Sequence, residues 1–144
     1  MLIAGFTACA EFTSYALVHP IIRQLPQKHH ILFEKSSLKT YGLIMPILMP
    51  LSVILTLSFA LFTNELGSIE LTARFTTAGM FILATFITIR FNVPINKEIK
   101  QWDADNPPFD WKEIRKQWMF FQSVRSWLLL IGFVSLCFSM AISY

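Results

Sequence analysis

Polar and ionisable side chains recur at helical spacing inside the apolar stretches of the chain. Glu11, Tyr15 and His19 follow one another at steps of four residues and therefore share one face of a helix. A carboxylate in the middle of an apolar span is costly unless it faces the protein interior. The column fits a proton path or acid–base set, with Glu11 and His19 as candidate catalytic residues and Tyr15 as a candidate substrate contact. The alternative is that Glu11 pairs with an arginine of another helix for structure alone.

A second polar stripe lies in the last apolar stretch, where Trp118, Gln122 and Arg125 follow at helical steps. Arg125 is the deepest of the three, so its guanidinium is expected inside the protein, where it can bind a carboxylate or a ligand oxygen. Snorkelling of this side chain to the headgroups is the alternative. We assign Arg125 as a candidate catalytic residue, and Trp118 and Gln122 as candidate substrate contacts.

Two asparagines flank a proline at the end of the third apolar stretch. Pro94 is expected to end or kink the helix there and to free backbone carbonyls near Asn92. Asn92 and Asn96 would then either cap the broken helix or bind a carbonyl of a ligand. Both are candidate substrate contacts.

These residues need long apolar helices to position them. Of the 144 residues, 54% are hydrophobic, and they gather in long runs. Each run offers enough residues to cross the ~30 Å hydrocarbon core of a bilayer. We predict an all-α fold, a polytopic four-helix membrane bundle forming a single domain over residues 1–144, with spans at about 2–18, 41–63, 71–91 and 117–142. The first run lacks a basic leader and a cleavage site, so it is expected to stay as a helix.

The basic residues predict the topology. Eleven of the twelve fall in the first and third loops or the adjoining helix ends, and Arg74 is the exception. The positive-inside rule then places loops one and three in the cytoplasm and both termini outside a cell (inner) membrane. Because the positive charge is explained in this way, no nucleic-acid partner is expected.

The third loop is too long for a tight turn and is expected to be partly helical. Asp110 can cap a helix that begins near Trp111. Trp102, Trp111 and Trp118 suit an aromatic belt at the membrane interface.

Motifs for other chemistries are missing from the sequence. Cys9 and Cys137 stand alone, without a Cys-x-x-Cys pair for disulfide exchange, and no phosphate loop or Ser-His-Asp order is found. Met45 and Met49 could join His19 in a copper site, but core packing is the favoured interpretation. No metal site is therefore predicted, and the residues specify no cofactor.

One stretch of the sequence resembles the anthrone oxygenase-like family of small four-helix membrane proteins, formerly classed as a domain of unknown function. It consists of Asn92-x-Pro94-x-Asn96, then Trp102 and Trp111, then Arg115-x-x-Trp118-x-x-x-Gln122-x-x-Arg125. The segment from Glu11 to Pro20 is also similar to the first helix of that family.

This resemblance implies a reaction. Members in fungal polyketide pathways oxidise anthrones to anthraquinones with molecular oxygen, without a known metal or flavin. Asn92, Asn96, Trp118 and Arg125 match the family pattern, whereas Gln122 stands where many members have His or Asn. A glutamine cannot act as a general base.

Two hypotheses follow. In the first, the protein is an oxidoreductase or monooxygenase that acts on a lipophilic aromatic or quinone-like substrate, in a pocket near the cytoplasmic helix ends. In the alternative it is a non-catalytic membrane subunit, or a lipid- or cofactor-binding scaffold of a larger complex. A small transporter is disfavoured because the sequence has no inverted repeat. The expected partners are the lipid bilayer and a lipophilic small molecule, and a homo-oligomer or a larger membrane complex is compatible with either hypothesis.

Overall fold

The computed structural model describes residues 1–62 and 67–142, and within these ranges it contains helices and no strand. The predicted all-α class is therefore confirmed. In chain order the elements are α1 (Leu2–Thr13), η1 (Ser14–Val18), α2 (His19–Ile22), α3 (Gln27–Leu61), α4 (Ser68–Ile87), η2 (Thr88–Asn92), α5 (Val93–Gln101) and α6 (Trp111–Ile142).

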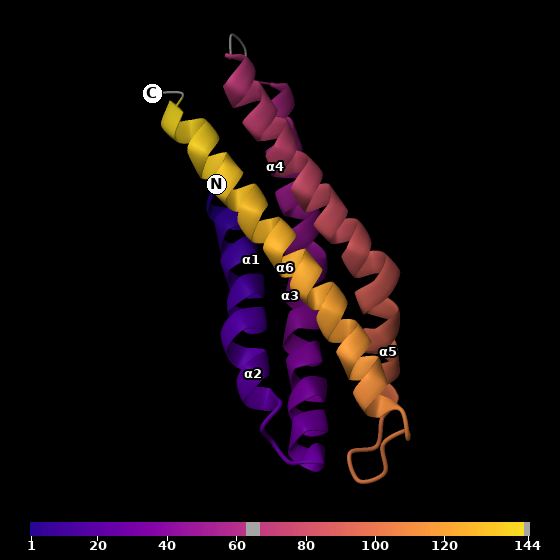
Figure 1. Ribbon diagram of the computed structural model, residues 1–144. Helices are drawn as coiled ribbons and strands as arrows, with labels where there is room; N and C mark the ends of the chain where they lie inside the picture. Colours follow the sequence, from indigo (N-terminus) through magenta and orange to yellow (C-terminus); the bar gives the residue numbers. More distant parts are fainter. Residues whose placement is uncertain (63–66, 143–144) are drawn as a thin grey trace.

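Within the described residues, these elements follow one another as four helical rods: α1–η1–α2, α3, α4–η2–α5 and α6 (Figure 1). The π-helical segment η1 joins α1 to α2, and η2 joins α4 to α5 in the same way. The rods run side by side in alternating directions, with the α2–α3 and α5–α6 connections at one end of the molecule. The N-terminus and the last turn of α6 lie toward the other end.

Each π-helical segment comes just before a proline. Pro20 follows η1 and Pro94 follows η2, each within the first two residues of the next α-helix. A proline has no amide hydrogen to donate, and its ring clashes with the carbonyl four residues earlier. Opening the preceding turn to the wider π geometry accommodates the ring without breaking the rod. The sequence prediction left open whether Pro94 ends or kinks its helix; the helix does not end there, because a π-helical turn precedes Pro94 and the rod continues to Gln101.

The helices extend well beyond the predicted spans at the end that carries the α2–α3 and α5–α6 connections. The second begins at Gln27 rather than near Tyr41, so most of the predicted first loop is helical. The third continues to Gln101, and the fourth begins at Trp111, as predicted from the third loop. Most of the polar residues at this end therefore lengthen the bundle, and the connections are confined to residues 23–26 and 102–110.

Three of the rods are long and apolar enough to cross a membrane, as expected of a membrane protein: Gln27–Leu61, Ser68–Gln101 and Trp111–Ile142. The first rod is divided by η1, and its longest α-helical segment, α1, has only 12 residues. Four rods agree with the predicted four-helix bundle.

Small residues bring the rods together in the half of the molecule where α3 ends and α4 begins. Ala4, Ala8, Ala84 and Gly132 lie at buried helix contacts, where small side chains let backbones approach closely. A Cβ added at Gly132 would lie 3.1 Å from the ring of Phe81 on α4. An alanine at this position would therefore require Phe81 or Met80 on α4 to shift by a few tenths of an ångström.

A second core fills the opposite half of the bundle. Trp102, Trp111 and Trp118 are buried in it with Ile31 and Ile99. These tryptophans were expected to lie in an interfacial belt, whereas they pack between the ends of the rods. Trp118 also donates its indole hydrogen to Asn96. Of the four tryptophans in the sequence, Trp127 is the exposed one, at 48%.

Candidate functional site

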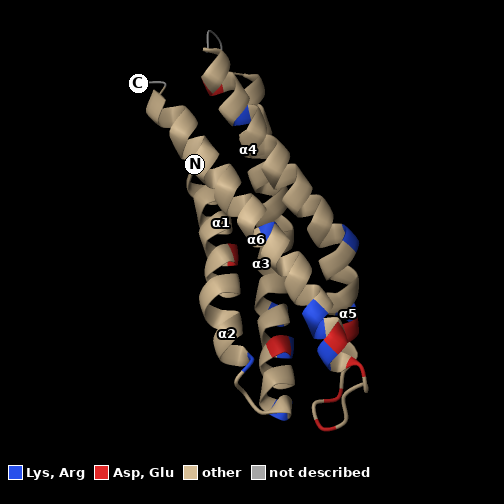
Figure 2. Ribbon diagram, in the orientation of Figure 1, with Lys and Arg blue, Asp and Glu red and all other residues tan. Residues whose placement is uncertain are grey.

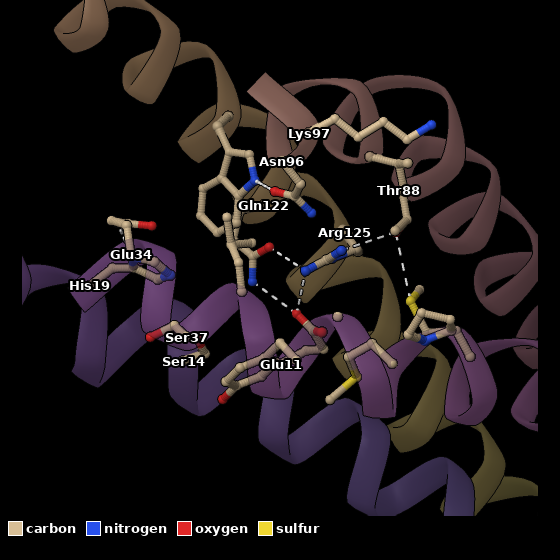
Figure 3. A pocket seen from close by; sticks show the side chains of 18 of the residues that line it. Glu11, Ser14, His19, Glu34, Ser37, Thr88, Asn96, Lys97, Gln122 and Arg125 are labelled. Carbon is tan, nitrogen blue, oxygen red and sulfur yellow. Dashed lines mark hydrogen bonds and ion pairs between the residues drawn. The ribbon is translucent and has the colours of Figure 1, made fainter. Parts of the chain in front are cut away.

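A cavity of about 580 Å³ lies in the half of the bundle that contains the tryptophan core, enclosed by all four rods. Most of its lining surface is apolar, and a hydrogen-bonded set of polar side chains forms one part of the wall (Figure 3). The polar and charged lining residues are Glu11, Ser14, His19, Glu34, Ser37, Tyr41, Thr85, Thr88, Asn96, Lys97, Lys100, Trp118, Gln122 and Arg125.

Glu11 and Arg125 meet at this polar wall. Glu11 is fully buried, and its Oε2 accepts from Arg125 Nη2 at 2.6 Å and from Gln122 Nε2 at 2.8 Å. Arg125 Nη2 also donates to the Gln122 side-chain oxygen, and all three side chains are joined in Figure 3. The two partners of Glu11 thus act on one of its oxygens. The other oxygen, Oε1, is buried without a hydrogen-bond partner.

The helices place these three residues by simple periodicity. Gln122 and Arg125 are one turn apart on the buried face of α6, and Glu11 lies on the buried face of α1. Ser126, one residue further along α6, donates to the backbone carbonyl of Glu11 at 3.2 Å. The ion pair is therefore held by a direct contact between the first and last rods.

Thr88 and Asn96 extend the polar wall onto the third rod. Arg125 Nη1 donates to Thr88 Oγ1 at 3.2 Å, and the Thr88 hydroxyl lies 3.7 Å from Met49 Sδ. Asn96 Oδ1 accepts from Trp118 Nε1 at 2.6 Å. Because that oxygen is occupied, the Asn96 amide nitrogen remains as a donor toward the cavity.

Six of the eight predicted site residues line this cavity: Glu11, His19, Asn96, Trp118, Gln122 and Arg125. Asn92 is fully buried behind the wall, where its Nδ2 lies 3.5 Å from the Trp118 carbonyl oxygen. Tyr15 faces a second cavity instead. The π-helical geometry of η1 places Ser14 rather than Tyr15 beside Glu11 on the cavity wall, so the regular four-residue column expected from the sequence is broken there.

A second buried carboxylate, Glu34, was missed in the sequence. It is 3% exposed and forms an ion pair with Arg115 Nη2. Its Oε1 also lies 3.4 Å from His30 Nε2 and 3.9 Å from His19 Nδ1. His30 and Glu34 are four residues apart, which is helical spacing. This spacing indicates the pair only if the segment is helical, whereas the apolar pattern predicts a loop before residue 41.

His19 lies just beyond the predicted end of the first span, with its ring 5.1 Å from that of Trp118. Burial lowers the pKa of His19 to about 4, although the nearby Glu34 carboxylate acts in the opposite direction. The imidazole is therefore neutral at pH 7 and can both donate and accept a hydrogen bond. Across residues 1–62 and 67–142, no cluster of three or more His, Cys, Asp or Glu side chains could hold a metal ion.

Fold and site together define a helical membrane protein with a ligand-sized cavity and a buried ion pair at its wall. The family model described as anthrone oxygenase matches residues 39–135. Since this match covers more than half of the 144 residues, the chain belongs to the anthrone oxygenase family. No curated protein and no solved structure matches it. The matched segment contains Asn96, Trp118, Gln122 and Arg125, and it begins after Glu11 and His19.

Proposed function

We propose that the protein is a membrane oxidoreductase of the oxygenase type, acting on a lipophilic aromatic substrate such as an anthrone or hydroquinone. The observation that carries the proposal is the buried Glu11–Arg125 pair at the wall of an apolar cavity. Its carboxylate keeps one oxygen, Oε1, without a partner. A carboxylate that is oriented by an arginine and keeps one oxygen without a partner is suited to take a proton from a bound molecule.

Binding would rest on the apolar lining and a few directed polar groups. Trp118 offers an aromatic surface, and the Asn96 amide nitrogen can donate to a substrate oxygen. The exposed lining residues Pro46 and Pro50 of α3 and Ile89 of η2 mark where the cavity opens to the side of the bundle. A substrate dissolved in the bilayer would enter between these two rods.

The proposed reaction starts with loss of a proton from a carbon flanked by two rings. Glu11 Oε1 accepts this proton, and the electron pair moves toward the substrate oxygen, which Asn96 stabilises. Molecular oxygen then adds to that carbon. The carbon ends as a carbonyl with one oxygen atom, and the second oxygen atom leaves as water with the two hydrogens that the carbon lost. Anthrone and O₂ thus give anthraquinone and water.

The test is turnover of an anthrone by the purified protein in lipid nanodiscs, followed by anthraquinone absorbance and oxygen consumption above the protein-free rate. Glu11→Gln should lower turnover about 100-fold or more, the usual contribution of a positioned proton acceptor. Arg125→Ala should also lower turnover, because the Glu11 carboxylate loses the group that orients it. Thr77→Val is the matched control. It also removes a buried interhelical hydrogen bond, from Thr77 Oγ1 to the Gly132 carbonyl at 3.0 Å, but lies outside the cavity. Unchanged turnover in both site variants would refute the proposal.

The second candidate is a non-catalytic scaffold that binds a lipid or cofactor. The observation in its favour is that Arg125 is already engaged by Glu11, Gln122 and Thr88, as a purely structural lock would be. This candidate predicts that the Glu11 and Arg125 variants lose stability while the wild-type protein shows no turnover of any anthrone or hydroquinone.

The protein is proposed to lie in the cell (inner) membrane, with the α2–α3 and α5–α6 connections in the cytoplasm and both termini outside. Positive charge supports this orientation, because Lys and Arg gather at the end with those connections (Figure 2). The proposed partners are the lipid bilayer and the lipophilic substrate.

A further inference from the structure

A second cavity, of about 630 Å³, lies at the same end of the bundle as the proposed substrate cavity. Glu34 and the three side chains around it, His19, His30 and Arg115, lie between the two cavities. Glu34 and His19 line the first cavity, whereas His30 and Arg115 line the second. Elements from the first, second and fourth rods surround it. The proposed reaction uses none of the residues in its wall.

The wall of this second cavity is strongly basic. Arg23, Lys112, Arg115 and Lys116 line it, and no Asp or Glu does. Three of these cations lie in the first two turns of α6, where the unpaired backbone amides of a helix add further positive potential. Glu34 pairs with Arg115 from behind the wall, and the remaining three cations leave the cavity with an excess of positive charge.

Two of the three donor nitrogens of the Arg115 guanidinium have no hydrogen-bond acceptor. Its side chain is 8% exposed and stacks over the Trp118 ring at 4.5 Å. Nη2 pairs with Glu34, but Nε and Nη1 are buried without a hydrogen-bond partner. A buried guanidinium with two unused donors is costly, and an anion with several oxygens would satisfy them.

We propose that this second cavity binds a phosphate group. Arginine binds phosphate through paired N–H donors, and the two flanking lysines add charge without demanding a fixed geometry. Trp111 and the 63% exposed Phe120 give the cavity an apolar rim. That rim suits the acyl chains of a phospholipid whose headgroup enters the cavity. A soluble phosphate ester carries the same phosphate group for the basic side chains to bind.

The experiment measures binding to the full-length purified protein. Native mass spectrometry in detergent would compare phosphatidylglycerol with phosphatidylcholine of the same acyl chains, and calorimetry would titrate glycerol 1-phosphate. We expect phosphatidylglycerol to be retained over phosphatidylcholine, and Lys112→Gln/Lys116→Gln to weaken its binding roughly tenfold or more. The matched control is Lys39→Gln/Arg90→Gln, which removes the same charge from exposed residues that line neither cavity.

Each outcome decides the proposal. If the Lys112/Lys116 variant selectively loses phosphatidylglycerol binding, the site is supported and the bound phosphate belongs to a lipid. If the variant instead selectively loses glycerol 1-phosphate binding, the site is supported and the bound phosphate belongs to a soluble ester. An equal loss in the Lys39/Arg90 control shows only a general charge effect and overturns the site. Absence of binding by both probes overturns it as well. Both lysines are exposed, so their replacement does not threaten folding.

Discussion

At the scale of single residues, the Glu11–Arg125 contact combines two roles that the sequence presented as alternatives. The ion pair exists, so part of the role of Glu11 is to compensate a buried arginine. Losing one partner of such a pair costs about 3–5 kcal/mol. Both donors nevertheless act on Oε2, which leaves Oε1 buried without a hydrogen-bond partner. A structural ion pair and an oxygen without a hydrogen-bond partner therefore coexist in one side chain.

His19 gives a prediction on pH dependence. Its pKa of about 4 in the folded protein lies below the ordinary value of 6.5, so the unfolded chain binds more protons between these two values. Stability must therefore fall as the pH is lowered through this window, by about 2 kcal/mol from pH 7 to pH 5. The measurement is the free energy of unfolding in detergent at several pH values. In His19→Gln, the free energy of unfolding should fall by about 2 kcal/mol less than in the wild-type protein between pH 7 and pH 5.

His29→Gln serves as the control for this measurement. His29 is exposed on α3, so its removal should leave the slope between pH 5 and pH 7 unchanged. If His19→Gln and the wild-type protein lose stability in parallel, the imidazole is not held neutral by burial, and the interpretation of its environment is wrong.

At the scale of elements, the sequence predicted which segments are helical but not their internal geometry. Apolar runs and the cap at Asp110 indicated four helices, and the fourth begins at Trp111 as expected. The π-helical turns before Pro20 and Pro94 could not be predicted in the same way, because Pro46 and Pro50 lie within α3 without such a turn. Whether a helix widens or tolerates a proline depends on the surrounding packing. This local choice decides that Ser14, not Tyr15, lines the cavity beside Glu11.

The opening between α3 and the rod formed by α4, η2 and α5 gives a prediction at the element scale. Ile89 is 64% exposed and lines the cavity at this opening. Ile89→Trp should obstruct entry of a bilayer-dissolved substrate and raise the KM about tenfold, with little change in kcat, because the polar wall is untouched. The assay is turnover at varied anthrone concentration in nanodiscs.

Ile82→Trp is the matched control for the opening. Ile82 lies on the same rod and is 45% exposed, but it does not line the cavity. The same bulk added there should leave the KM near that of the wild-type protein. A similar rise in both variants would mean that the substrate does not pass between these rods.

At the scale of the whole molecule, composition and charge placement were the most informative signals. Most of the basic residues that indicated topology lie at one end of the bundle (Figure 2), whereas Arg74 lies near the start of α4 and Arg125 is buried further along α6. Pairing between rods was less predictable, because the partner of a buried charge depends on helix rotation. Arg125 could be placed inside the bundle from its depth, whereas the pairing of Arg115 with Glu34 required knowing that the second rod begins at Gln27.

The orientation of the bundle in the membrane is the prediction at this scale. The natural cysteines Cys9 and Cys137 are first replaced by alanine. Gly67→Cys then places a thiol at the start of α4, and Phe109→Cys places one in the α5–α6 connection, where Phe109 is fully exposed. A membrane-impermeant maleimide should label Cys at position 67 in intact cells and at position 109 only after lysis, since the basic end of the protein faces the cytoplasm. The reverse pattern would place both termini inside. It would also move the basic second cavity to the outer surface, away from the anionic cytoplasmic leaflet whose headgroups suit it.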